Sequence, residues 1–289
     1  MTARSYLYVP GDAQDRLVRS TSRGADAVIA DLEDSIAPAQ RRAAVEAVAA
    51  WLATGAPDTE RWVRITSVAD AAHQLARLTS GRLDGIVIPK VAAVADVARV
   101  VEVLDEAADR AELPVRVMPL IETAKALQTI DEIAAHPRVA ALQLGELDLA
   151  ADLGVMVGPD EHELLYARSR IVAASAASRL EPPIGGVSPD FVDLDLLRAT
   201  TQRLQRLGFV GRAVIHPRQV PVVHEVFTPT PSDVEEASRM IAAYEATIAN
   251  GRGVLVGSDG RMVDEAVVRM SRRTVALARG RNARRTEQP

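Results

Sequence analysis

Two acidic residues, Glu122 and Asp148, each follow a short apolar run that is typical of a buried strand. The first run covers residues 115–121 and the second covers residues 139–145. In a barrel of alternating strands and helices, the side chains that follow the strands gather on one face, where active sites lie. Carboxylate oxygens that converge there suit a hard divalent cation, Mg²⁺ or Mn²⁺. The sequence therefore predicts metal binding by Glu122 and Asp148, with helix capping as the alternative role.

Further charged residues stand at the ends of other apolar runs. Asp31, Glu33 and Asp34 follow residues 27–30, Arg64 lies between Val63 and Ile65, and Lys90 follows residues 85–88. The acidic segment could be a solvated loop, but an arginine inside an apolar run needs an anionic partner. That partner is either an inner carboxylate or a substrate carboxylate held by two hydrogen bonds. Several carboxylates at one barrel mouth would repel one another without a cation, which favours metal binding over purely structural use.

Other catalytic patterns are missing from the sequence. His216 is the one histidine at the end of a strand candidate, and its proline neighbour favours a structural hydrogen bond over catalysis. There is no paired-histidine metal motif, no phosphate-cradling loop and no nucleophile elbow.

Short apolar runs alternate with longer amphipathic ones along most of the chain, and this alternation predicts an α/β fold. Eight runs are strand candidates, at residues 6–9, 27–30, 62–65, 85–88, 115–120, 140–144, 183–187 and 213–215. Helical patterns lie between them, for example at residues 41–52, 94–110 and 166–179. Eight alternations predict a (β/α)₈ TIM barrel over residues 1–221. A doubly wound open sheet is the alternative, but no glycine-rich dinucleotide motif follows the first strand.

Residues 222–289 are expected to form a C-terminal extension made of helices and a hairpin. Ser232 and Asp233 could cap a helix that runs to about residue 249. Turn residues then flank a short apolar run at 254–256, and a last helix covers about 264–278. The basic tail at 279–289 is expected to fray. The pattern leaves open whether this extension packs on its own barrel or reaches a neighbouring subunit.

Composition excludes several functional classes. The chain has 289 residues, 48% of them hydrophobic, no cysteine and a formal net charge of −5. It therefore has no disulfide, no zinc–thiolate site and no cysteine nucleophile, and a reducing cytoplasm is the simplest location. Scattered basic residues argue against nucleic acid as the main partner. We find no N-terminal signal segment and no apolar run long enough to cross a membrane.

Seven motifs taken together resemble the citrate lyase β-subunit-like proteins, which belong with malyl-CoA and citramalyl-CoA lyases in the HpcH/HpaI aldolase superfamily. The match extends to residues 260–264, and the motifs lie in the family's order and spacing at residues 4–11, 31–38, 63–66, 88–90, 120–123, 145–149 and 215–219.

The resemblance implies a Mg²⁺-dependent carbon–carbon lyase on a (β/α)₈ barrel, assembled as a homotrimer. Its metal ligands would be Glu122 and Asp148, and Arg64 would hold the acyl substrate. The acids that contact substrate and metal-bound water would be Glu33 and Asp34. An acid/base aspartate on a segment that closes over a neighbouring subunit's site would be Asp264. Lys90 and Arg16 are candidates for binding CoA phosphate or substrate charge.

The expected reaction cleaves, or forms, a 3-hydroxyacyl-CoA thioester and yields an acyl-CoA and a small oxoacid. The acyl group cannot be read from the residues, because malyl, citramalyl, citryl and related thioesters need the same contacts. Three alternatives stay open. They are a malate or citramalate synthase or a thioesterase on the same thioesters, a citrate lyase β-type subunit acting on an acyl-carrier-protein thioester, and a pyruvate-type class II aldolase.

Overall fold

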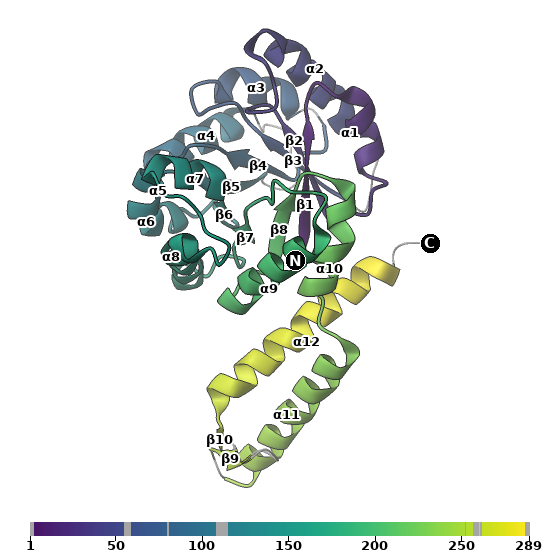
Figure 1. Cartoon of the computed structure of the whole chain (residues 1–289), viewed down its shortest axis with the longest axis vertical. Helices are drawn as coiled ribbons and strands as arrows, with labels where there is room; N and C mark the ends of the chain where they lie inside the picture. Colours follow the sequence, from purple (N-terminus) through teal and green to yellow (C-terminus); the bar gives the residue numbers. More distant parts are fainter. Residues whose placement is uncertain are drawn as a thin grey trace. The chain divides into compact units, whose positions relative to one another are not determined.

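The chain folds into two compact units, Met1–His224 and Glu225–Pro289, shown in Figure 1. The computed structural model describes residues 3–54, 59–79, 81–107, 115–251, 253–256, 260 and 262–286. Within these residues, no helix combines the length and the apolar character that a membrane span requires.

The first unit contains a closed barrel of eight parallel strands in chain order, with β8 paired to β1. The predicted (β/α)₈ barrel is therefore confirmed, and the open-sheet alternative is wrong. Strands β6 and β7 are shorter than predicted. Residues 140–142 make only scattered hydrogen bonds to the neighbouring strands, and Pro183 has no backbone N–H to donate. The strands are β1 (Ser5–Pro10), β2 (Ala27–Asp31), β3 (Glu60–Arg64), β4 (Gly85–Ile88), β5 (Arg116–Ile121), β6 (Gln143–Leu144), β7 (Ile184–Gly185) and β8 (Gly211–Val214).

Helices between the strands cover the outside of the barrel (Figure 1). In α2, for example, Ala44, Val45, Val48 and Trp51 are buried at helical spacing against the strands. The predicted helix at 94–110 ends at Ala107, and residues 108–110 lie outside the described residues. The helices are α1 (Gln14–Ser20), α2 (Arg41–Leu52), α3 (Ala71–Leu78), α4 (Val94–Ala107), α5 (Ala124–Gln128), α6 (Ile130–Ala134), α7 (Glu146–Leu153), α8 (Leu165–Ala177), α9 (Leu194–Leu207) and α10 (Val220–Phe227).

Residues that point into the barrel form its core. Trp62 on β3 lies edge-on to Tyr6 on β1, with ring centroids 6.0 Å apart. Gly85 on the neighbouring strand β4 leaves the space that the indole ring fills, since a Cβ there would lie 2.2 Å from Trp62. Such close packing makes the interior sensitive to a single added methyl group.

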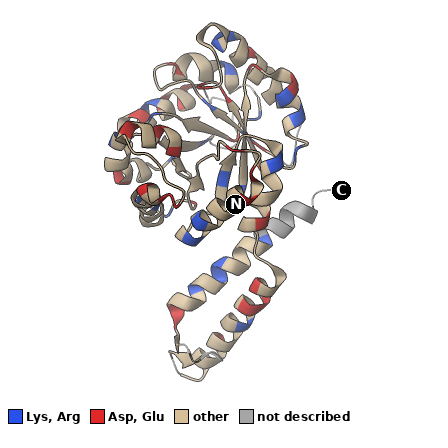
Figure 2. Ribbon diagram, viewed as in Figure 1, with Lys and Arg blue, Asp and Glu red and all other residues tan. Residues whose placement is uncertain are grey.

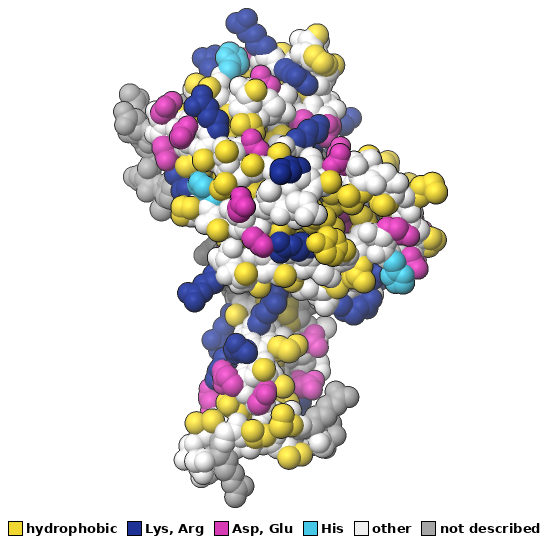
Figure 3. Space-filling view, turned by 90° about the vertical axis from the view of Figure 1, so that its left-hand side faces the viewer, with side chains coloured by type: hydrophobic (Ala, Val, Ile, Leu, Met, Phe, Trp, Pro, Cys, Tyr) yellow, Lys and Arg dark blue, Asp and Glu magenta, His cyan; other side chains and the backbone are white. Residues whose placement is uncertain are grey.

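The outer surface carries mixed charge. Basic and acidic side chains alternate over the barrel helices in Figure 2, and the barrel face shown in Figure 3 has the same interspersed pattern. A surface of this kind is well solvated and presents no large area of one sign on that face.

The second unit is a helical hairpin. Helix α11 (Pro231–Ala249) packs against α12 (Glu265–Thr286), and the short strands β9 (Leu255–Val256) and β10 (Met262–Val263) pair antiparallel. Tyr244, Val263 and Val268 form its small core. The extension of helices and a hairpin is thus confirmed.

Two details of that prediction are wrong. Thr230, not Ser232, caps α11, because its hydroxyl accepts from the Asp233 amide while the Asp233 carboxylate accepts from the Thr230 amide. The tail predicted to fray from residue 279 is helical to Thr286, because arginine, its commonest residue, is a strong helix former despite its charge. Residues 287–289 lie outside the described residues.

Replacing Gly85 by alanine should destabilise the barrel. The added methyl group would overlap the buried Trp62 ring, and overpacking of this kind costs about 1–3 kcal/mol. Urea denaturation of Gly85→Ala should therefore show a lower free energy of unfolding. Gly158→Ala is the matched control, because its nearest neighbour would be an unstrained 3.6 Å away. Equal stability of the two variants would show that the ring can move aside.

Candidate active site at the carboxyl end of the barrel strands

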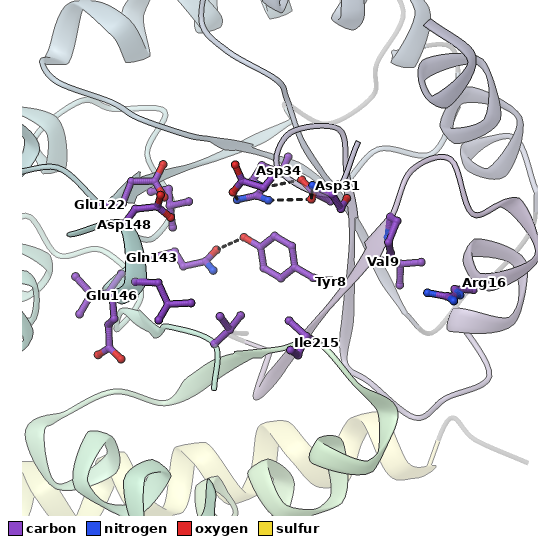
Figure 4. Close-up of a pocket in the computed structure, with 18 residues that line it drawn as sticks. Tyr8, Val9, Arg16, Asp31, Asp34, Glu122, Gln143, Glu146, Asp148 and Ile215 are labelled. Atoms are coloured by element: carbon purple, nitrogen blue, oxygen red, sulfur yellow. Dashed lines mark hydrogen bonds and ion pairs between the residues drawn. The ribbon is translucent and has the colours of Figure 1, made fainter. Parts of the chain in front are cut away.

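A cavity of about 430 Å³ opens where the barrel strands end. Figure 4 shows the side chains that point into it from different strands. Its polar lining residues are Tyr8, Arg16, Asp31, Asp34, Ser35, Arg64, Glu122, Gln143, Glu146 and Asp148. Chemistry-bearing residues far apart in the sequence therefore meet in one pocket, as parallel strands in a barrel require.

Arg64 sits among three carboxylates. Its Nε and Nη2 atoms donate to the two oxygens of Asp31, at 2.6 and 2.8 Å. Its Nη1 atom lies 2.9 Å from Glu33 Oε2 and 3.1 Å from Asp34 Oδ2. Arg64 therefore pairs with inner carboxylates, and its predicted contact with the acyl substrate stays a prediction. Burial alone would raise the pKa of Asp31, but the hydrogen bonds and charge of Arg64 bring it below the usual value.

Lys90 contacts two acids of the site at once. Its Nζ lies 2.7 Å from Glu33 Oε1, and its backbone amide donates to Glu122 Oε1 at 2.6 Å. The residue has φ of 51°, in the left-handed region that side chains other than glycine seldom adopt. Backbone strain of this kind clusters at functional sites, where the surrounding structure enforces it.

Glu122 and Asp148 lie next to each other at one side of the pocket (Figure 4). Glu122 follows β5 and is buried, whereas Asp148 lies in the first turn of α7 and is exposed. Burial raises the pKa of Glu122 to about 8, and repulsion from Glu33 and Asp148 adds to that rise. A positive charge beside this carboxyl group would favour its anionic form.

Helix capping does not explain the two acids. Thr123, not Glu122, caps α5 by accepting from the Ala126 amide, and α7 begins without a side-chain cap. The alternative role that the sequence left open is therefore wrong for both residues.

The residues present fit a divalent cation. Gly145 lies against Glu122, and a Cβ at this position would come within 2.7 Å of Glu122 Oε2, so only glycine leaves that oxygen its space. No cluster of three or more His, Cys, Asp or Glu ligands occurs among the described residues. Mg²⁺ needs none, because it keeps several water ligands and binds through one or two carboxylates. Glu122 and Asp148 would hold it, and this role stays a prediction.

The other predicted residues have different surroundings. Arg16 on α1 lines the outer part of the cavity and is exposed. Asp264 belongs to the second unit, where its carboxylate accepts from the amides of Ala266 and Val267 at the start of α12. Its predicted acid/base role stays a prediction. His216 makes the structural hydrogen bond expected of it, accepting from the Arg218 amide.

Sequence reasoning missed two side chains that cross the pocket. Tyr8 on β1 and Gln143 on β6 face each other, and the Tyr8 hydroxyl donates to Gln143 Oε1 at 3.2 Å (Figure 4). The alternation of Tyr6 and Tyr8 along β1 could have placed both on the inner face. Tyr8 is the nearer of the two to the carboxyl end of β1 and therefore to the mouth.

Glu146 was also missed. It lines the cavity, but Figure 4 shows its carboxylate turned away from Glu122 and Asp148. Its Oε1 accepts from Arg168 Nε at 2.6 Å, and Arg168 also pairs with Glu161. These buried contacts fix the first turn of α7, on which Asp148 stands.

Comparison with known proteins gives a consistent result. Residues 4–217 match the family model described as HpcH/HpaI aldolase/citrate lyase. A (3S)-malyl-CoA thioesterase of Cereibacter sphaeroides is 33% identical over 280 residues, which are 95% of this chain and 94% of the relative. An L-malyl-CoA/beta-methylmalyl-CoA lyase of the same organism is 35% identical, covering 93% of this chain and 92% of the relative.

Solved structures agree with this match. The protein CitE of Mycobacterium tuberculosis, in complex with magnesium, acetoacetate and coenzyme A, superposes with a TM-score of 0.78 at 28% identity. That alignment covers 95% of this chain and 97% of the other. A citrate lyase of Burkholderia xenovorans LB400 has the same fold, with a TM-score of 0.85 at 20% identity over 98% of this chain and 93% of the other.

Metal affinity at this site should depend on pH. A cation that binds Glu122 must displace its proton, so affinity falls as pH drops below the pKa of about 8, approaching about tenfold per pH unit. Titration calorimetry with Mg²⁺ between pH 6 and pH 9 measures this. Glu122→Gln, which has no proton to displace, should bind weakly with a flat profile over that range. A flat profile for the unsubstituted protein would exclude Glu122 as the titrating ligand.

Proposed function

This chain belongs to the HpcH/HpaI aldolase/citrate lyase family, and we propose that within it the chain is a Mg²⁺-dependent carbon–carbon lyase acting on a 3-hydroxyacyl-CoA thioester. The observation that carries the proposal is the juxtaposition of Glu122 and Asp148 at the barrel mouth, beside the buried group of Arg64 and its three acids. In this arrangement, Glu122 and Asp148 could bind a cation, and Arg64 with its three acids places buried charges beside that cation.

The cation has a defined chemical task. When bound, Mg²⁺ supplies a Lewis acid that polarises the oxygens of a hydroxy acid or oxoacid. Glu122 and Asp148 would hold it, and the Lys90 amide keeps one oxygen of Glu122 in a fixed direction. A preorganised ligand of this kind does not have to be reoriented during the reaction.

The chain's own acids and bases complete the reaction. In cleavage, the hydroxyl of the thioester loses its proton, the carbon–carbon bond breaks, and its electron pair passes to the acyl thioester as an enolate. Asp34, half exposed at the pocket edge, can receive the hydroxyl proton. Glu33 is paired with Arg64 and Lys90, and its task is electrostatic. We assign protonation of the enolate carbon to Asp264, which would act in a neighbouring subunit of a homotrimer.

The CoA moiety suits a second cavity next to the first. This cavity has a volume of about 390 Å³ and shares Tyr8, Val9, Pro10, Arg16 and Ile215 with the catalytic pocket. Arg16 and Arg19 on α1 line it, together with Arg23 in the turn that follows this helix. Guanidinium groups bind phosphate oxygens through paired hydrogen bonds, so this is where we place the phosphates of CoA.

Thioester hydrolysis is the second candidate function. A relative 33% identical over 95% of this chain is named a malyl-CoA thioesterase, and that reaction would use the same thioesters. The two functions differ in their products, because hydrolysis yields free CoA and an intact hydroxy acid.

A panel of hydroxyacyl-CoA thioesters, assayed with Mg²⁺ and with excess EDTA, tests the proposal. We expect Mg²⁺-dependent release of acetyl-CoA or propionyl-CoA together with an oxoacid. Asp148→Asn should reduce turnover by about 10²-fold or more and keep the melting temperature, because Asp148 is exposed and the buried face of α7 is formed by other residues.

Three results would contradict parts of the proposal. Release of free CoA together with an intact hydroxy acid, and of no acyl-CoA or oxoacid, would assign thioesterase action instead. No turnover of any CoA thioester, despite Mg²⁺ binding, would favour an acyl-carrier-protein thioester as the substrate. Full activity of Asp148→Asn would remove Asp148 from the metal site.

A further inference from the structure

Tyr8 stands where the two cavities meet. It lines both the catalytic pocket and the arginine-lined cavity, and in Figure 4 its ring reaches across the pocket toward Gln143. If CoA lies in the second cavity and the acyl group in the first, the thioester linking them must pass this residue. The inference below therefore rests on the proposed function.

The charged groups around Tyr8 are largely committed to one another. Three of the five N–H groups of the Arg64 guanidinium donate to Asp31 and Asp34, and its Nη1 atom also forms an ion pair with Glu33 Oε2. Glu122 Oε1 already accepts from the Lys90 amide. Arg64 therefore sets the local charge but has little hydrogen-bonding capacity left for a substrate oxygen.

Tyr8 is a neutral donor at the same place. Its hydroxyl points at Gln143 Oε1 across 3.2 Å, which is long for an O–H···O bond, whose usual length is about 2.7–2.8 Å. A weak bond of this kind is easily exchanged for one to a ligand. Arg64 lies over the face of the ring, 5.2 Å from its centroid, and holds the phenol in place.

The phenol also keeps its proton. Burial raises the pKa of the Tyr8 hydroxyl far above its usual value, so it stays protonated throughout the physiological range. A group that donates a hydrogen bond without losing its proton can stabilise negative charge on a nearby oxygen.

We propose that the Tyr8 hydroxyl donates a hydrogen bond to the thioester carbonyl oxygen as that oxygen becomes an enolate, with Gln143 holding the hydroxyl when no ligand is bound. No covalent bond to Tyr8 forms, and no proton is transferred from it. Tyr8 is then a catalytic residue of the carbon–carbon lyase reaction, and Gln143 is a positioning residue.

Three variants separate this role from a structural one. Tyr8→Phe removes the donor, Gln143→Met removes its resting partner, and Tyr166→Phe makes the same chemical change on the exposed face of α8. Each is assayed for kcat and KM of thioester cleavage with Mg²⁺. Each is also assayed for exchange of the α-hydrogens of the acyl-CoA product with D₂O, which reports enolate formation alone.

We expect Tyr8→Phe to lower kcat and the exchange rate by about 10²-fold with little change in KM, as removal of one oxyanion donor does. Gln143→Met should lower kcat and the exchange rate by less than tenfold, because Gln143 is not the partner of the Tyr8 hydroxyl in the reacting complex. Tyr166→Phe should have the same kcat, KM and exchange rate as the unsubstituted enzyme.

Other outcomes overturn the inference. If Tyr8→Phe and Gln143→Met lower kcat and the exchange rate equally, the hydrogen bond between the two residues only connects β1 to β6. If Tyr8→Phe keeps kcat within threefold, or changes KM alone, the hydroxyl does not stabilise the enolate. If the unsubstituted protein neither cleaves thioesters nor exchanges α-hydrogens, the proposed function fails, and this inference fails with it.

Discussion

Buried charge at the barrel mouth is the constraint on which the rest of this structure depends. Asp31 ends β2, Glu33 and Asp34 follow it, and Arg64 from the neighbouring strand contacts all three. Breaking a buried ion pair by removing one partner typically costs about 3–5 kcal/mol, because the remaining charge is left uncompensated. Arg64 is therefore first a structural counter-ion, and it places a fixed electrostatic field beside the cavity. Lys90 extends this network by joining Glu33 to Glu122, with a strained backbone that the site enforces.

The network leaves one side of the pocket short of positive charge. Glu122 is buried beside Asp148, and its pKa is raised. Gly145 has no side chain, which leaves space for Glu122 Oε2. A divalent cation held by this pair would complete the charge balance and supply the chemistry expected of the family. The arginine-lined cavity, the shared residue Tyr8 and the metal pair then follow one another in the order in which CoA, thioester and acyl group would lie.

Much of this architecture could be predicted from the sequence. Alternating apolar runs predicted the eight-stranded barrel, because buried parallel strands and amphipathic helices have different periods. The positions of Arg64, Lys90 and Glu122 at strand ends followed from the same alternation. Contacts between distant residues could not be predicted in this way. The sequence pattern was compatible with two kinds of partner for Arg64, an inner carboxylate and a substrate carboxylate. It also gave no reason to connect Tyr8 with Gln143, which are 135 residues apart. Basic composition does not make residues 279–286 fray, because arginine favours helix.

The central claim is that Glu122 and Asp148 together hold a divalent cation. Anomalous diffraction from crystals soaked in Mn²⁺, a metal with the same preference for oxygen ligands as Mg²⁺, tests this most directly. The account predicts one strong peak within coordination distance of both carboxylates, at about 2.0–2.2 Å from a ligand oxygen, and its loss in Glu122→Gln. A peak at the Asp31–Arg64 group, or no peak in the pocket, would contradict the account.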